Sequence, residues 1–115
     1  MDESEFLKRK GSIEILCELE SGEKGFTELK NLDISPSTLS ARLKEAMDLG
    51  LVDQKLCREE RAKIKYYLTE KGREVMKMVE SIKKDYFRLK EEAKRLEEEA
   101  KKKRQEIEEI LEKLR

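Results

Sequence analysis

The sequence predicts a mainly α (α+β) fold, in which a small mixed domain is followed by one long C-terminal helix. Short segments with helical spacing lie before residue 50, two strand-like runs lie between residues 52 and 69, and apolar residues then recur every three or four positions. A chain of 115 residues has room for one domain with a modest core and one appendage. We therefore expect a domain over residues 1–72 and a coiled-coil helix over residues 73–115.

Charge is abundant but balanced. Lysine and arginine number 27, aspartate and glutamate number 27, and charged residues make up 47% of the chain. This balance excludes a globally basic nucleic-acid-binding surface, so any basic patch must be local. Residues 1–33 contain nine acids and five bases, whereas residues 34–71 contain eight bases and six acids. A DNA-binding surface in the second segment would have modest, salt-sensitive affinity.

Several other classes of protein are not expected. No apolar run approaches the ~18 to 20 residues that span a bilayer, and the acidic start MDESEFLKRK does not resemble a signal peptide, so we expect a cytoplasmic protein without membrane contact. Histidine is absent and Cys17 and Cys57 form no CxxC pair, so we expect no metal or cofactor and two buried cysteines. Without a histidine base or a phosphate-binding loop, no enzymatic activity is expected.

Two short helices are predicted before residue 33. The segment SIEILCELESG, residues 12–22, has apolar residues at helical spacing, with Ser12 as a candidate N-cap and Gly22 as the stop. The segment GFTELKNL, residues 25–32, places Thr27 before a second helix that contains Leu29 and Leu32.

A third helix, over about residues 36–49, has the clearest signals. Ser35 is the predicted N-cap, Pro36 takes the first helical position and Gly50 ends the helix. Its inner stripe is predicted to consist of Leu39, Leu43 and Met47. Its outer face carries short or polar side chains followed by two cations: Ser37, Thr38, Ser40, Ala41, Arg42 and Lys44.

A hairpin follows this helix. The runs VDQKLC (52–57) and KIKYYLT (63–69) have the alternation of strands, and the five residues REERA (58–62) join them. Three short helices followed by a two-stranded hairpin form a winged helix-turn-helix. In that fold the third helix enters the major groove of double-stranded DNA, and the hairpin tip, or wing, reaches the backbone or minor groove.

The segment GSIEILCELESGEKGFTELKNLDISPSTLSARLKEAMDLGLV, followed by RAKIKYYLTEKG, resembles the winged-helix transcriptional regulators of the HxlR and MarR type. The shared features are the FxELK, ISPSTLSxRLKE, GLV and YxLTEKG fragments, in this order. The resemblance implies a dimeric DNA-binding regulator, with groove-reading residues at Ser37, Thr38, Ser40 and Arg42 and a wing contact at Arg61. Together with neighbouring cations, the expected DNA-binding set is Ser37, Thr38, Ser40, Arg42, Lys44, Arg58, Arg61 and Lys63.

Other interpretations of the same residues remain open. Arg42 and Lys44 could form an ordinary solvated face with nearby acids, and Arg58 and Arg61 could pair with Glu59 and Glu60. Tyr66 and Tyr67 are typical of packing rather than base stacking. At the level of function, the alternatives to a sequence-selective regulator are a protein-protein interaction module and an architectural chromatin protein built on the same fold.

Beyond Thr69, a predicted N-cap, the chain contains no proline, and a heptad seam extends to its end. A helix over residues 75–114 would be about 60 Å long, more than a small domain can cover. A second copy of the chain is the simplest partner for its apolar stripe. Together with Val75, and with Lys103 filling one gap, the expected dimerisation residues are Val79, Ile82, Tyr86, Leu89, Ala93, Leu96, Ala100, Ile107, Ile110 and Leu114.

The orientation of such a homodimer can be argued from its layers. An antiparallel pair places Ala93 against Leu96, Ala100 against Leu89, and Lys103 against the ring of Tyr86, so small side chains face large ones. The flanking charges favour a parallel pair instead, but exposed ion pairs contribute only about 0.2 to 0.5 kcal/mol each, less than a mismatched core layer costs. The sequence therefore favours the antiparallel pair, an arrangement that resembles small archaeal winged-helix DNA-binding proteins that dimerise through one long terminal helix.

Overall fold

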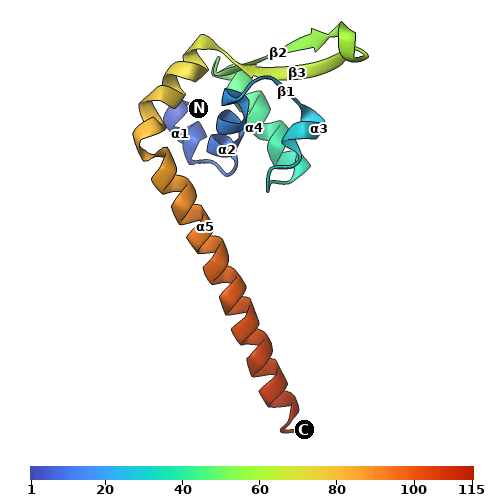
Figure 1. Cartoon of the computed structure of the whole chain (residues 1–115), viewed down its shortest axis with the longest axis vertical. Coiled ribbons are helices and arrows are strands. Elements are labelled where there is room, and N and C mark those ends of the chain that lie inside the picture. Colours follow the sequence, from blue (N-terminus) through green and yellow to red (C-terminus); the bar gives the residue numbers. More distant parts are fainter. The chain divides into compact units, whose positions relative to one another are not determined.

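The computed structural model describes all residues from Met1 to Arg115. The chain divides into two units, Met1–Met78 and Val79–Arg115, which are described separately below. The mainly helical winged-helix fold predicted from the sequence is confirmed (Figure 1). Its elements in chain order are α1 (Glu3–Lys8), α2 (Ser12–Glu20), β1 (Lys24–Gly25), α3 (Phe26–Leu29), α4 (Pro36–Asp48), β2 (Val52–Cys57), a 3-10 turn (Arg58–Glu60), β3 (Lys63–Leu68) and α5 (Glu70–Glu112).

Helix α1 was not predicted. Asp2 caps it, because its side-chain Oδ1 accepts a hydrogen bond from the backbone N of Glu5 at 2.8 Å. Phe6 is fully buried where α1 packs against α2 and α4. The acidic N-terminal segment therefore belongs to the folded domain, and its one aromatic side chain contributes to the core.

The next two helices are present, and α2 stops before Gly22 as predicted, but the predicted N-caps of both helices were wrong. Helix α2 is preceded by Gly11, which has φ +89°, while Ser12 is buried within the first turn. Helix α3 begins at Phe26, before Thr27, because the Glu28 carboxylate accepts a hydrogen bond from the backbone N of Gly25 at 3.2 Å. It also ends earlier than predicted, so Leu32 lies outside it.

Both ends of α4 are as predicted. The Ser35 hydroxyl accepts a hydrogen bond from the backbone N of Thr38 at 3.2 Å, and Pro36 occupies the first turn. At the other end Gly50 adopts φ +74° and the backbone N of Leu51 donates to the carbonyl of Ala46 at 2.9 Å, which forms a Schellman motif. The inner stripe differs in one position: the buried residues are Leu39, Leu43 and Ala46, whereas Met47 is only half-buried.

The sheet has three strands rather than the two that were predicted. Its order is β1-β3-β2, and both pairings are antiparallel. Lys24 pairs with Tyr66, and Gly25 pairs with Lys65. At these two positions β3 is the middle strand of the sheet, with β1 on one side and β2 on the other. The distal part of the β2–β3 hairpin projects from the helices (Figure 1).

The core of the first unit contains side chains from every helix and from β2 and β3. Fully burying a large aliphatic or aromatic side chain contributes about 1.5 to 3 kcal/mol, so this cluster is the main source of stability. Cys17 and Cys57 are not part of it: both are half-buried, which corrects the expectation that they are buried. The buried apolar residues are Phe6, Ile15, Leu16, Leu19, Leu29, Leu39, Leu43, Ala46, Leu51, Val52, Leu68 and Met76.

The end of α4 and the start of α5 are joined through three consecutive carbonyls. The Leu51 carbonyl accepts a hydrogen bond from the backbone N of Thr69 at 3.0 Å, and the Gly50 carbonyl accepts one from the Thr69 hydroxyl at 2.5 Å. The Leu49 carbonyl accepts one from Lys71 Nζ at 2.8 Å. These three carbonyls follow Asp48, the last residue of α4, so Thr69 and Lys71 fix the turn between α4 and β2.

Thr69 is also the N-cap of α5, as predicted, because its Oγ1 accepts a hydrogen bond from the backbone N of Gly72 at 3.1 Å. Gly72 is buried at this junction. A Cβ atom at Gly72 would lie 2.1 Å from the carbonyl oxygen of Leu51. Only glycine therefore permits the first turn of α5 to approach Leu51 this closely.

Replacing Gly72 with alanine is expected to destabilise the first unit by more than about 2 kcal/mol, because the contacting atom is backbone and cannot rotate away. The free energy of unfolding is measured by chemical denaturation. Gly25→Ala is the matched control, since a Cβ there would lie 3.7 Å from its nearest neighbours at an ordinary negative φ. Equal stability of the two variants would contradict the close approach at Gly72.

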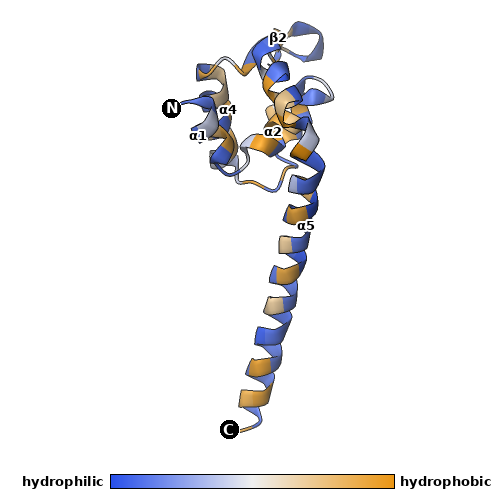
Figure 2. Ribbon diagram, turned by 90° about the vertical axis from the view of Figure 1, so that its left-hand side faces the viewer, coloured by the Kyte–Doolittle hydropathy of each residue, from blue (hydrophilic) through white to orange (hydrophobic).

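The second unit consists of α5 from Val79 onward and residues 113–115, which follow the end of the helix. Apolar residues recur along it, as the hydropathy colouring in Figure 2 shows. Most of these side chains are exposed: Ile82 is 61% exposed, Leu96 59% and Leu114 80%. No helix of the structure, α5 included, combines the length and the apolar character that crossing a membrane requires.

Candidate nucleic-acid interface

Helix α4 presents a continuous exposed face. Ser37, Ser40, Ala41, Lys44 and Asp48 are all exposed and are spaced three, one, three and four residues apart, so they share one side of the helix. Three of the five side chains are small, which permits close approach of another molecule. Lys44 forms no ion pair and is the one free cation on this face.

Thr38, another predicted contact, lies at the edge of this face and is half-buried. Its hydroxyl accepts a hydrogen bond from the Ser35 hydroxyl at 2.8 Å. The hydroxyl oxygens of Ser35 and Ser37 are also within hydrogen-bond distance, 3.2 Å apart. The start of α4 is therefore a small hydroxyl cluster that fixes the first turn while leaving Ser37 exposed.

Arg42 is held within the protein. Its Nε donates a hydrogen bond to the carbonyl of Lys10 at 3.1 Å, and one terminal nitrogen lies 2.5 Å from a Glu45 oxygen. Glu45 also pairs with Arg9 at 3.1 Å, and only 15% of the Arg42 side chain is exposed. The interpretation in which Arg42 pairs with a neighbouring acid thus describes the free protein, where Arg42 links α4 to the segment between α1 and α2.

The wing tip consists of residues 58–62 and has an unusual backbone. Arg61 (φ 61°, ψ 41°) and Ala62 (φ 57°) lie consecutively in the left-handed region, which costs roughly 1–2 kcal/mol for each residue that has a Cβ. Such strain persists only where surrounding contacts hold the chain. The tip is therefore a held conformation rather than a relaxed loop.

The two cations of the tip, and Lys63 directly after it, are unpaired. Arg58, Arg61 and Lys63 are exposed and form no ion pair, so the arginines do not pair with the adjacent glutamates. Glu60 pairs instead with Lys65 of β3, whose Nζ lies 2.9 Å from Glu60 Oε2. Of the two acids of the tip, Glu60 is therefore neutralised by a lysine that lies outside the tip.

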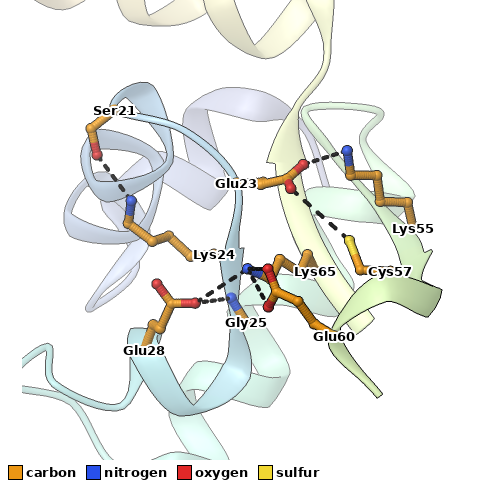
Figure 3. A network of polar contacts seen from close by, with 9 residues as sticks. All are labelled: Ser21, Glu23, Lys24, Gly25, Glu28, Lys55, Cys57, Glu60 and Lys65. Carbon is orange, nitrogen blue, oxygen red and sulfur yellow. Dashed lines mark hydrogen bonds and ion pairs between the residues drawn. The ribbon is translucent and has the colours of Figure 1, made fainter. Parts of the chain in front are cut away.

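A wider polar network connects the wing to the segment before α3 (Figure 3). Glu23 forms an ion pair with Lys55 of β2, and its other oxygen lies 4.0 Å from the Cys57 sulfur. The hydrogen bond from Lys55 lowers the pKa of the Glu23 carboxyl below its usual 4.5 and raises the pKa of Lys55. Both groups are therefore charged at neutral pH, and the network ties β2 to the chain near β1.

Lys65 is the centre of this network on β3. Besides Glu60, its Nζ lies 3.9 Å from Glu28 Oε1, the atom that accepts the hydrogen bond from Gly25. The hydrogen bond to Glu60 raises the pKa of Lys65 above 10.5. Sequence reasoning missed Lys65, Glu23 and Glu28 because these partners come together only when β1 pairs with β3.

A groove of about 540 Å³ lies between α3 and β3, and Glu28, Glu60 and Lys65 of this network are among the residues that line it. Phe26 and Ile64 contribute its apolar wall, and Lys30 lies over the ring of Phe26 with its Nζ 5.5 Å from the centroid. Tyr66 and Tyr67 are half-buried, consistent with packing roles. No group of three acidic, cysteine or histidine side chains that could hold a metal ion is present.

A helix-turn-helix whose second helix has an exposed face, followed by a hairpin with unpaired cations, defines a winged helix of the class that binds DNA. The chain belongs to the HxlR-like helix-turn-helix family, whose pattern it matches over residues 6–94. Among curated proteins it is 38% identical over 84 residues to an HTH-type transcriptional regulator of Methanocaldococcus jannaschii, a match that covers 68% of this chain and 73% of that protein.

Solved structures show the same fold. A possible HxlR family transcriptional factor from Thermoplasma volcanium has a TM-score of 0.65 and 27% identity, with 77% of this chain and 85% of that chain covered. A MarR family regulator from Enterococcus faecalis has a TM-score of 0.64 and 26% identity, with 79% and 84% covered. The resemblance to HxlR and MarR regulators predicted from the sequence is confirmed.

Replacing Ala62 with glycine is expected to stabilise the protein by about 0.5 to 1 kcal/mol, because relief of the left-handed strain exceeds the added entropy of the unfolded chain. Ala41→Gly is the matched control: Ala41 is exposed within α4, so glycine there should cost about 1 kcal/mol. Thermal unfolding measures both variants. If both changes destabilise the protein equally, the tip does not hold Ala62 in a left-handed conformation.

Proposed function

We propose that the protein is a homodimeric, sequence-selective transcriptional regulator without enzymatic activity, in which α4 enters the major groove of double-stranded DNA and the wing contacts the backbone or minor groove. One observation carries the proposal: an exposed helix face with small side chains is followed in the chain by a hairpin with three unpaired cations, two in its tip and one at the start of β3. Small side chains let the helix approach base edges, and cations compensate phosphate charge.

On α4, base-edge contacts are assigned to Ser37, Ser40 and Lys44, with Thr38 at the edge of the contact. Hydroxyl groups can donate to or accept from base edges, and a lysine near the end of the exposed face can reach guanine or phosphate. Arg42 is also assigned to the DNA contact. Because its guanidinium is bound to the Glu45 carboxylate in the free protein, it must exchange that carboxylate for DNA on binding.

On the wing, Arg58, Arg61 and Lys63 are assigned to phosphate or minor-groove contacts. Such contacts set affinity and position rather than sequence preference. Since the whole chain has no net charge, long-range attraction to DNA is weak and binding depends on these few local contacts. Affinity is therefore modest and falls with salt.

The double variant Lys44→Ala and Arg61→Ala is expected to lose most DNA affinity, and each substitution should lower the slope of log K against log salt by about one. Fluorescence anisotropy with a duplex of about 30 base pairs, at several salt concentrations, measures both quantities. Lys8→Ala is the control, because it removes an exposed cation of α1, outside the proposed interface. Unchanged affinity of the double variant would rule out the site assignment.

The second candidate function is a protein-protein interaction module, and the exposed apolar side chains of the wing favour it. Leu56 and Ile64 pair across β2 and β3 and are 54% and 48% exposed. In that case the wild-type chain would not remain on a DNA resin at ~0.15 M salt, where nonspecific DNA-binding proteins still bind. An architectural chromatin protein would remain bound but would select no preferred site from random duplexes.

The seam of α5 is assigned to dimerisation with a second copy of the chain. Its apolar side chains are mostly exposed in the single chain, although Val79 and Tyr86 are half-buried. An antiparallel second copy supplies matching layers, because Ala93 and Ala100 then face Leu96 and Leu89. A face of this length, apolar at a and d positions and charged beside them, fits a coiled-coil partner better than a compact one.

Wild-type protein is expected at twice the 13.6 kDa of one chain, and Leu96→Asp should yield a monomer, because it places a charge in the seam. Gln105→Asp is the control, because it adds the same single negative charge at an exposed position outside the seam. Light scattering measures the mass. A monomeric wild type, or an unaffected Leu96→Asp variant, would refute dimerisation through the seam.

The orientation of the two helices is tested by disulfide formation between single introduced cysteines, in a chain whose own cysteines are replaced (Cys17→Ser and Cys57→Ser). A mixture of Leu89→Cys and Ala100→Cys chains should form the mixed disulfide, because the antiparallel register brings these positions together. Disulfides between two Leu89→Cys chains, or between two Ala100→Cys chains, would indicate the parallel pair instead.

A further inference from the structure

We propose that Lys65 is a positioning residue for the wing: it holds Glu60 back from the tip, so that Arg58 and Arg61 face DNA without a free Glu60 carboxylate beside them. The inference rests on the proposed DNA-binding function and assigns a role to a residue that does not itself contact DNA. It also accounts for an acid placed close to the proposed phosphate contacts.

The backbone of Lys65 is fixed by strands on both sides. It pairs with Lys55 on β2 and with Gly25 on β1, so it lies in the middle strand of the sheet. Its side chain is only 13% exposed, which is low for lysine. The ammonium group therefore has a defined position relative to the helices and to the tip.

That ammonium group lies between two carboxylates (Figure 3). Its Nζ is 3.1 Å from Glu60 Oε1 and 2.9 Å from Glu60 Oε2, so both oxygens are engaged. On the other side it is 3.9 Å from Glu28, whose carboxylate caps the backbone at Gly25. The chain of contacts thus runs from the tip through Lys65 to the first turn of α3.

The ion pair also spans the strained part of the tip. Arg61 and Ala62, the two left-handed residues, lie between Glu60 and Lys65 in the chain. A contact that fixes Glu60 to the middle strand restrains both residues, since few other conformations of the tip allow the Glu60–Lys65 ion pair to form. Loss of the pair would release a carboxylate and loosen the two residues at once.

A direct phosphate contact by Lys65 is the competing role. Two carboxylates already surround its ammonium group and little of the side chain is exposed, so a phosphate would have to displace Glu60. The two roles predict different behaviour when Glu60 is made neutral. Removing a phosphate contact weakens binding whatever residue 60 is, whereas removing a restraint on Glu60 matters only while residue 60 is charged.

The test is a double-mutant cycle with Lys65→Met, Glu60→Gln and the combined variant, assayed by anisotropy with the duplex used above. Lys65→Met should weaken DNA binding about tenfold, and the combined variant should bind within about twofold of Glu60→Gln. Lys65→Arg should bind like wild type, because it retains the ion pair. A combined variant as weak as Lys65→Met would overturn the proposal and indicate a direct contact.

Amide hydrogen exchange of residues 58–62, measured without DNA, separates this inference from the proposed function. Exchange at the tip should be faster in Lys65→Met than in wild type and Lys65→Arg, with thermal unfolding confirming that each variant is folded. Unchanged exchange would overturn the positioning role even if DNA binding is confirmed. Faster exchange in a protein that binds no DNA would support the restraint and refute only the proposed function.

Discussion

The close approach of α5 to the carbonyl of Leu51 is the constraint on which the first unit depends. The amide of Leu51 closes the Schellman motif of α4, its side chain is buried, and its carbonyl accepts the backbone hydrogen bond from Thr69. Because α4 ends and β2 begins at this point, one residue sets how the exposed helix face and the wing are placed relative to each other. Gly72 makes this approach possible by having no side chain.

Acidic residues near the candidate interface are mostly held by basic residues, and of these only Arg42 lies on the same element as the acid that it binds. Glu45 binds Arg42 and Arg9, Glu60 binds Lys65, and Glu23 binds Lys55. These pairs leave other cations, on α4 and on the tip, without partners. A chain with no net charge can in this way present local positive charge, because position rather than total charge decides what a nearby phosphate encounters.

The sequence predicted best those features whose cause is local. The serine and proline at the start of α4, Gly50 at its end and Thr69 before α5 act on backbone groups within a few residues, and all are confirmed. Helix α1 was missed because six residues contain too little periodicity to identify. Strand β1 was missed because its two residues obtain their hydrogen bonds from β3, some forty positions later.

The sequence by itself determined the class of fold, the helix that carries the exposed face, the extent of the hairpin and a heptad seam, because periodicity and capping are properties of neighbouring residues. Only the tertiary structure decided which charged side chains are free. Arg42 and Lys44 look equivalent in the sequence, yet the carbonyl of Lys10 and the carboxylate of Glu45 bind one and leave the other exposed. The reason is that the hydrogen bond from Arg42 to Lys10 and the ion pair between Arg9 and Glu45 join different segments of the domain, and chain folding alone sets those distances.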